Sequence, residues 1–343
     1  MASGTHTRRV RVVAAAVALA IAAALALGFA GRAWFMGKPA APMEKLRIAL
    51  PGLPHAALLH IAAAKGYFAE EGLDVSITIT THGRAAMDLM DQGKVELVAA
   101  AEVPFVISVV KGEPLAIVAT LVSVANATEI VARRDHAIAV PSDLRGKKVG
   151  VTFGSGGDYS TWAFLIRHRL APDSITLVDV APGKMVGELL GGRVDAVSTW
   201  EPIKSDVQAA LAGNALSFTE PDVYTGIFAL IGRIETLKAR AGATEKLVRA
   251  LLKAEAFNRA EPQQALKLLA GQLQLDLKAL EPGWSDFTFG VDLNQSLLIT
   301  LEDETRWAMA RGYVDKGPTP NFLSHLYLDA LLAARPERVT VVR

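Results

Sequence analysis

The chain has 343 residues, of which 51% are hydrophobic, and a formal net charge of +1. This length suffices for about two domains, and the near-neutral charge without a basic stripe gives no support to a nucleic-acid partner. The lack of cysteine excludes disulfides, thiolate metal sites, a cysteine nucleophile and a lipidated N-terminal cysteine. The seven histidines show no metal-ligand spacing, so we predict neither a metal site nor a cofactor.

The N-terminal segment predicts export. Three arginines at residues 8–11 precede an uncharged run of mainly Ala, Leu and Val at residues 12–31. A basic head followed by an apolar body is typical of a secretory signal, and the run is also long enough to span a bilayer. Residues 1–31 are therefore either a cleaved signal peptide or a retained transmembrane anchor, and both place the rest in the periplasm. Residues 32–44, which contain two prolines, are predicted to be a linker.

The next segment predicts a β-α-β unit. Residues 46–50 alternate between apolar and other side chains, residues 55–64 form an Ala-rich apolar helix, and residues 73–80 alternate again as a half-buried strand. Gly66 and Gly72 supply the two turns between helix and strand. Because two sequential strands joined by a helix pair in parallel, we expect a parallel sheet with a right-handed crossover.

The chain repeats part of this pattern. MDLMDQGKVELVAAAEVP at residues 87–104 and GELLGGRVDAVSTWEP at residues 187–202 each combine a helix end, a glycine, a basic residue, a short apolar strand, a glutamate and a proline. In both, a glycine lies nine residues before the glutamate, which is Glu102 or Glu201. The repeat indicates two similar α/β units.

The order of elements predicts that one unit is inserted in the other. The sequence from residue 244 onward carries apolar residues at helical spacing, with helices expected at 246–261, 262–273, 302–312 and 322–332 and a short edge strand at 339–342. These helices are too apolar to stand alone and should pack on the first unit. We therefore predict lobe 1 from residues 45–126 and 228–343, lobe 2 from residues 127–227, and a hinge between them.

Candidate binding residues follow predicted strands, where parallel sheets bind ligands. They are His55, Glu102, Gly154, Ser155, Asp158, Trp200 and Glu201. Each has a second interpretation. His55 could be a solvated residue of a first helical turn, the GSGG loop an ordinary turn capped by Asp158, and each glutamate an acid that favours a helix N-terminus. The loop is neither a phosphate-binding Walker loop nor a serine-nucleophile elbow, and no catalytic residue is predicted.

Several stretches together resemble the periplasmic substrate-binding proteins of ABC importers in the nitrate/sulfonate/taurine class. They are AAAKGYFAEEGLDV, AAAEVPF, DLRGKKVGVTFGSGGDYSTWAFL, LLGGRVDAVSTWEP and LYLDALLAARPERV, in this order along nearly the whole exported part. The resemblance implies a two-lobed periplasmic-binding-protein type II fold that closes on a small solute. It also implies delivery to an ABC permease and its ATPase, and we expect a monomer. One departure is Asp158, where the resemblance leads us to expect glutamate.

Two other functions remain open at this stage. Thiamine-pyrimidine synthases resemble the same class and would make the chain an enzyme, but the export segment and the missing cysteine cluster argue against that. An uncleaved N-terminus would favour a membrane-tethered sensor subunit. For the binding protein itself, we predict a cleft bordered by the carboxylates of Glu102, Asp158 and Glu201. Such a cleft favours a nitrogen-bearing, donor-rich or zwitterionic solute with its flat part against Trp200, because an unpaired carboxylate in a closed cleft is costly.

Overall fold

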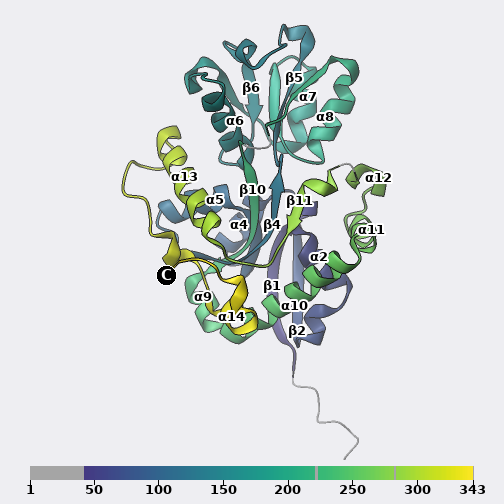
Figure 1. Ribbon diagram of the computed structural model, residues 1–343, viewed down its shortest axis with the longest axis vertical. Helices are drawn as coiled ribbons and strands as arrows, with labels where there is room; N and C mark the ends of the chain where they lie inside the picture. The colour runs from purple at the N-terminus through teal and green to yellow at the C-terminus, as the bar shows by residue number, and fades with distance from the viewer. Residues whose placement is uncertain (1–41, 221–222, 282, 343) are drawn as a thin grey trace, which may run out of the picture. The chain divides into compact units, whose positions relative to one another are not determined.

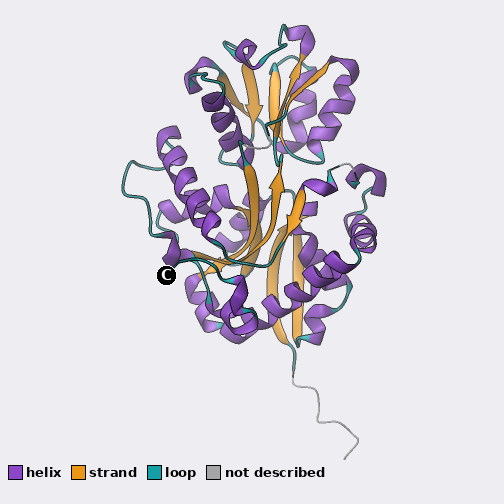
Figure 2. Cartoon of the chain, viewed as in Figure 1, coloured by secondary structure: helices purple, strands orange, loops and turns teal. Residues whose placement is uncertain are grey.

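The computed structural model describes residues 42–220, 223–281 and 283–342. The predicted signal or anchor at residues 1–31 and nearly all of the predicted linker at 32–44 lie outside these residues. Within the described ranges, no helix combines the length and the apolar character that crossing a membrane requires. From Met43 onward the chain forms one compact unit, in which helices flank two sheets (Figures 1 and 2).

The first sheet has the strand order β11-β4-β10-β3-β1-β2. Its strands are β1 (Glu44–Pro51), β2 (Leu73–Thr80), β3 (Leu97–Ala101), β4 (Leu115–Ala125), β10 (Thr225–Arg233) and β11 (Phe287–Phe289). Strand β1 pairs in parallel with β2 and β3, as the β-α-β pattern predicts, whereas β10 pairs antiparallel with β3 and β4. The sheet is therefore mixed, and the prediction of a parallel core holds for β2, β1 and β3.

The second sheet has the strand order β7-β6-β8-β5-β9. Its strands are β5 (Glu129–Arg133), β6 (Lys148–Val151), β7 (Thr176–Asp179), β8 (Ala196–Thr199) and β9 (Ala215–Phe218). Strands β7, β6 and β8 are parallel, and β5 runs antiparallel to β8 and β9. The two sheets thus share a design in which one half is parallel and the other antiparallel.

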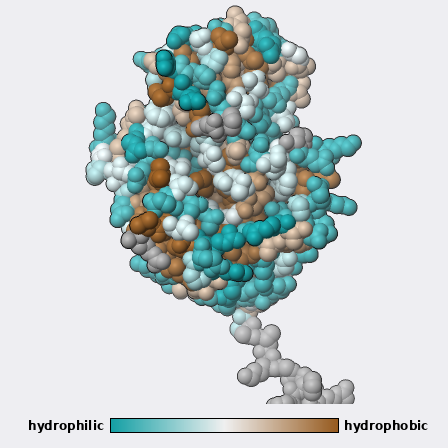
Figure 3. Space-filling model, in the orientation of Figure 1, coloured by the Kyte–Doolittle hydropathy of each residue, from teal (hydrophilic) through white to brown (hydrophobic). Residues whose placement is uncertain are grey.

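Thirteen α-helices are described. They are α2 (Ala57–Ala64), α3 (Tyr67–Glu70), α4 (Gly83–Asp91), α5 (Glu102–Val110), α6 (Gly156–Arg167), α7 (Met185–Leu190), α8 (Ile203–Leu211), α9 (Ile234–Ala239), α10 (Ala241–Ala260), α11 (Pro262–Leu273), α12 (Leu277–Leu280), α13 (Gln295–Arg311) and α14 (Asp329–Ala334). The apolar faces of these helices pack on the sheets, so the visible surface in Figure 3 is mainly hydrophilic, with small hydrophobic patches.

Two predictions near the C-terminus are wrong. The helix expected at residues 322–332 is a 3₁₀ turn over Phe322–His325 followed by the short α14. The edge strand expected at 339–342 is reduced to one bridge between Leu293 and Val339. At the first place the amide of Tyr327 donates to the carbonyl of Ile117 on β4 at 2.8 Å, and at the second the amide of Thr340 donates to the carbonyl of Leu293 at 2.9 Å.

The repeated sequence pattern has a structural counterpart. Helix α4 leads into β3 and helix α7 leads into β8, and each connection contains a glycine in the left-handed region, Gly93 at φ 70° and Gly192 at φ 69°. A side chain other than glycine is strained at such φ values. The two glycines therefore occupy corresponding turns in the two units. Glu102 directly follows β3, and Trp200 directly follows β8.

The chain passes between the sheets twice. It leaves the first sheet after β4, enters the second at β5, and returns from β9 to β10. Strands β4 and β10 are long neighbours that pair from Leu115 with Arg233 to Ala125 with Thr225 (Figure 1). All strands of the second sheet lie between residues 129 and 218. The sequence predicts lobe 1 at residues 45–126 and 228–343 and lobe 2 at residues 127–227. That these two lobes move relative to each other about a hinge stays a prediction.

Candidate functional site

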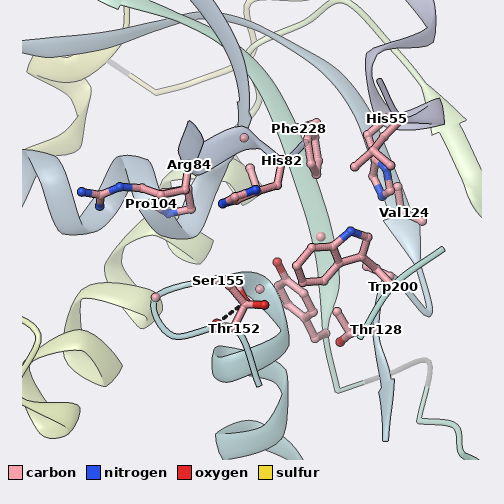
Figure 4. A pocket seen from close by; sticks show the side chains of 18 of the residues that line it. His55, His82, Arg84, Pro104, Val124, Thr128, Thr152, Ser155, Trp200 and Phe228 are labelled. Atoms are coloured by element: carbon pink, nitrogen blue, oxygen red, sulfur yellow. Dashed lines mark hydrogen bonds between the residues drawn. The ribbon is translucent and has the colours of Figure 1, made fainter. Parts of the chain in front are cut away.

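One pocket gathers residues from both sheets, mainly at the carboxyl ends of parallel strands (Figure 4). The space that it outlines measures about 700 Å³, and part of this space is open solvent. Its lining comprises Leu53, His55, His82, Gly83, Arg84, Ala101, Pro104, Val124, Ala127, Thr128, Thr152, Phe153, Gly154, Ser155, Gly156, Trp200, Tyr224, Gly226 and Phe228. Four of the seven predicted site residues are therefore brought together here, namely His55, Gly154, Ser155 and Trp200.

His55 is a buried polar residue at the aromatic end of the pocket. It lies in the 3₁₀ turn Pro54–Ala56 after β1 and is only 3% exposed, so the interpretation as a solvated first-turn residue does not hold. Its ring centroid lies 4.4 Å from that of Phe228 and 5.2 Å from that of Phe287. Burial lowers the pKa of His55 to about 4, which keeps the ring neutral at pH 7. Its Nδ1 is buried and has no hydrogen-bond partner among the described residues.

The GSGG loop forms the N-terminus of α6 at the pocket. Gly154 has φ 68°, and the Ser155 hydroxyl donates to the carbonyl of Thr152 at 2.6 Å, which fixes the entry into the helix. A Cβ on Gly156 would lie 2.7 Å from the hydroxyl oxygen of Tyr224, so any larger residue here would have to displace the tyrosine. Because the first amides of a helix lack intrahelical acceptors, this end of the pocket presents free N–H groups and the positive end of a helix dipole.

A second helix N-terminus borders the same pocket. Helix α4 begins at Gly83, and His82, Gly83 and Arg84 all line the pocket. A Cβ on Gly83 would lie 2.9 Å from the Cα of Ala100, so the glycine lets α4 approach strand β3 closely. The Arg84 guanidinium bonds to Asp88 at 3.1 Å and is half-exposed, and Figure 4 shows it pointing away from His55 and Trp200. Arg84 therefore extends toward solvent, although its residue lines the pocket.

Asp158 does not line the pocket. It is fully buried in the first turn of α6, where its carboxylate accepts a hydrogen bond from the amide of Gly154 at 3.2 Å and another from the hydroxyl of Tyr313. The guanidinium of Arg311 lies 3.7 Å from the other carboxylate oxygen. Burial raises the pKa of Asp158, against the lowering effect of these donors. Asp158 therefore joins α6 to the end of α13. It also caps the GSGG loop, which is the alternative to ligand binding that the sequence left open.

Glu201 lies just past Trp200 but turns back toward its own helix. Its carboxylate accepts from the Ser205 hydroxyl at 2.8 Å and pairs with the Lys204 ammonium at 3.2 Å. The same ammonium lies 3.1 Å from Glu129 at the start of β5. Glu201 thus stabilises the start of α8 and is not part of the pocket lining, whereas its neighbour Trp200 is.

Glu102 is buried behind the pocket. It begins α5 and is 0% exposed. One carboxylate oxygen accepts from the Tyr224 hydroxyl at 2.5 Å and the other from the Ile227 amide at 3.0 Å. All three carboxylates that the sequence analysis placed at the cleft are therefore engaged by donors of the protein, and the pocket lining among the described residues contains no carboxylate. The prediction of a donor-rich solute assumed unpaired carboxylates at the cleft, and this assumption is wrong.

Sequence reasoning missed Tyr224, Phe228, His82 and Thr128 in the lining. Tyr224 and Phe228 reach the pocket because β10 runs antiparallel to β3, which brings the beginning of β10 to the edge where β3 ends. Nothing local in the sequence marks that direction. His82 carried a usable signal, since it directly precedes the N-terminus of a predicted helix after a strand. In the part of the chain that the structure describes, no cluster of three His, Asp or Glu residues could hold a metal ion.

The sequence is similar to a protein family and to several proteins that are named as binding proteins. A family model described as NMT1/THI5 like matches residues 54–265. A protein of Brucella abortus (strain 2308), named as a binding protein, is 24% identical over 224 residues that cover 64% of this chain and 69% of that protein. The formylaminopyrimidine-binding protein of Halalkalibacterium halodurans is 28% identical over 171 residues, 45% of this chain and 47% of that protein.

Solved structures extend the likeness to the whole compact unit. The periplasmic aliphatic sulphonate binding protein of Escherichia coli has a TM-score of 0.71 at 17% identity and covers 84% of this chain and 98% of that chain. The periplasmic nitrate-binding protein of Synechocystis PCC 6803 has a TM-score of 0.66 at 15% identity and covers 85% and 89%. A desulfurization enzyme has a TM-score of 0.57 at 16% identity and covers 85% and 100%. At these identities the likeness shows a shared fold, the α/β fold of periplasmic binding proteins with two mixed sheets.

Proposed function

The chain belongs to the NMT1/THI5-like family, and from this premise we propose that it is an extracytoplasmic solute-binding protein of an ABC importer. It would capture a small molecule in the pocket and deliver it to a permease and ATPase as a monomer. The observation that carries the proposal is a pocket lined from both sheets, beside two paired strands that connect them. Closure of two parts about such connections is a common way to enclose a solute.

The pocket chemistry favours an organic anion with a flat apolar part. At one end lie the N-termini of α4 and α6, which attract an anionic or acceptor-rich group. At the other end lie His55, Trp200 and Phe228, which together offer aromatic surface and one unpartnered ring nitrogen. No carboxylate of the described lining would repel the anion. This proposal replaces the donor-rich solute inferred from the sequence.

Calorimetric titration tests the proposal and ranks ligand classes. The solutes are benzenesulfonate, benzoate, methanesulfonate, nitrate, taurine and an aminopyrimidine, each added to the purified protein. We expect the aromatic anions to bind most tightly and methanesulfonate more weakly, because the small anion leaves the aromatic end unfilled. Saturation at about 100 times the dissociation constant should raise the free energy of unfolding by about 2.7 kcal/mol.

The titrations separate three outcomes. Tight binding of the aminopyrimidine with no binding of aromatic anions would contradict the proposed ligand class but keep the binding protein. Absence of binding for every class would contradict the binding function for this pocket. Chromatography of the solute after incubation addresses catalysis, since a binding protein returns the solute unchanged and a synthase-like enzyme does not.

A further inference from the structure

Two buried carboxyl groups meet behind the pocket. Glu102 on α5 and Glu304 on α13 are both 0% exposed, on two helices that pack against each other through Val103, Ile107, Trp307 and Ala308. Each carboxyl group lies close enough to the other to shift its pKa. Neither oxygen of Glu304 receives a hydrogen bond from any donor group of the described residues. Two adjacent carboxylates in a dry interior repel each other strongly, so one of them must carry a proton.

The hydrogen bonds decide which carboxyl carries the charge. Glu102 already accepts from the Tyr224 hydroxyl at 2.5 Å and from the Ile227 amide at 3.0 Å. Hydrogen bonds from donors favour the ionised form of a carboxyl, and Glu304 lacks such donors. A protonated Glu304 can donate to Glu102, which gives the single negative charge three donors. Burial raises the pKa of both carboxyl groups.

Arg306, two residues beyond Glu304 on α13, is a cation near the pair, but it is itself paired with Asp303. The titratable and charged groups around it come from three elements and are Tyr159 on α6, Tyr224 ahead of β10, and Asp303 and Arg306 on α13. Asp303 acts on Glu304 with the same sign of charge, and Arg306 acts on Tyr159. A bound proton is therefore what relieves the repulsion within the pair.

The pair is connected to the pocket through Tyr224. This side chain is 8% exposed, lines the pocket, and lies against Gly156 at the N-terminus of α6. Its ring also contacts the ring of Tyr159 on α6, at a centroid distance of 5.3 Å. Ile227 is the third residue of β10, so Glu102 holds both the tyrosine and the strand where the chain re-enters the first sheet.

We propose that Glu102 and Glu304 share one proton and act as positioning residues, which hold Tyr224 against the GSGG loop and keep α13 packed on α5. Loss of the shared proton places two charges in the interior, lets water enter between α5 and α13, and releases the segment at residues 223–228 from its fixed position. The shape of the pocket then depends on pH through a group that does not line it.

Hydrogen exchange of the full-length chain, followed by mass spectrometry, tests the proposal without a ligand. Fragments covering residues 223–228 and 301–308 are compared at pH 6 and pH 9, after correction for the intrinsic pH dependence of exchange. We expect protection of both fragments in the wild type to fall from pH 6 to pH 9, since the shared proton is lost as the pH rises. Glu304→Gln should keep high protection at both pH values, because its amide donates to Glu102 and does not titrate.

The matched control is Glu302→Gln, two residues away on the exposed side of the same helix, which should behave like the wild type. Glu304→Leu removes the donor without adding charge and should leave residues 223–228 weakly protected at both pH values. Equal protection of the wild-type fragments at pH 6 and pH 9 would overturn the proposal. So would a pH-dependent loss in Glu304→Gln as large as that in the wild type. The wild-type profile alone decides the matter if a variant fails to fold.

Discussion

Substitution of Gly156 by alanine should damage the pocket through a single contact. A Cβ at this position would lie 2.7 Å from the hydroxyl oxygen of Tyr224, and 3.2 Å and 3.3 Å from two of its ring carbons. The hydroxyl is held in place by its hydrogen bond to Glu102, so it has little freedom to move away. Glycine-to-alanine changes in a helix ordinarily stabilise by about 0.5–1 kcal/mol, whereas overpacking costs about 1–3 kcal/mol.

The net expectation is a loss of about 1–2 kcal/mol in the free energy of unfolding for Gly156→Ala. Urea denaturation followed by circular dichroism measures it. The control is Gly187→Ala on α7, where the added Cβ meets no atom within 4 Å, and which should be neutral or slightly stabilising.

Substitution of Tyr224 by phenylalanine should reduce the cost of Gly156→Ala. Tyr224→Phe alone loses a hydrogen bond to a buried carboxylate, which costs about 1.5–3 kcal/mol. It also removes the atom nearest to the added Cβ, so Gly156→Ala in the Tyr224→Phe background should cost less than half of what it costs in the wild type. Identical penalties in the two backgrounds would refute the contact as the cause. A stabilising Gly156→Ala would refute it as well.

Three further outcomes follow from the site. Trp200→Ala should weaken binding of benzenesulfonate about fivefold in calorimetry, because stacking on an aromatic ring contributes about 1 kcal/mol, whereas Trp162→Ala outside the pocket should not. Because the pKa of His55 is lowered, the unfolded chain binds more protons than the folded one between pH 6.5 and about 4, and the wild type loses stability on acidification across this range. His55→Phe has no imidazole to protonate, so its loss of unfolding free energy over the same range should be about 3 kcal/mol smaller. Urea denaturation at several pH values measures the difference. The raised pKa of Glu304 has the opposite consequence, because the folded chain binds more protons than the unfolded one above pH 4.5, so the wild type loses stability as the pH rises. The melting temperature of Glu304→Gln, minus that of the wild type, should therefore increase from pH 5 to pH 9. A difference that stays constant would contradict the shared proton.

Local patterns in the sequence predicted the scaffold well. Alternation gave β2 at Leu73–Thr80 with its bounds, and Gly66 and Gly72 adopt positive φ, as expected for the two turns. The repeat glycines Gly93 and Gly192 also have positive φ. Placing loops at the carboxyl ends of strands also brought His55, Ser155 and Trp200 to one pocket. Each of these features is set by residues close together in the chain.

The carboxylates show where sequence reasoning fails. An acid at the start of a helix is visible in the sequence, but its partner is not. Glu102 is bound by Tyr224, 122 residues away, and Asp158 by Tyr313, 155 residues away. Because burial and distant donors decide whether a carboxylate faces a ligand, the charge of the pocket could not be predicted before these pairings were known.

The pairing of β4 with β10 has a consequence for how the chain folds. Ala125 and Thr225 face each other at the end of the ladder, so the whole second sheet occupies the place of a hairpin turn between two antiparallel strands. Closing that turn over a flexible segment of 100 residues is slow, because the entropy of closure must be lost before the strands pair. If the second sheet folds first, it brings its own two ends together and shortens the effective loop. The order of folding would then run from the inserted sheet to the sheet that surrounds it in sequence.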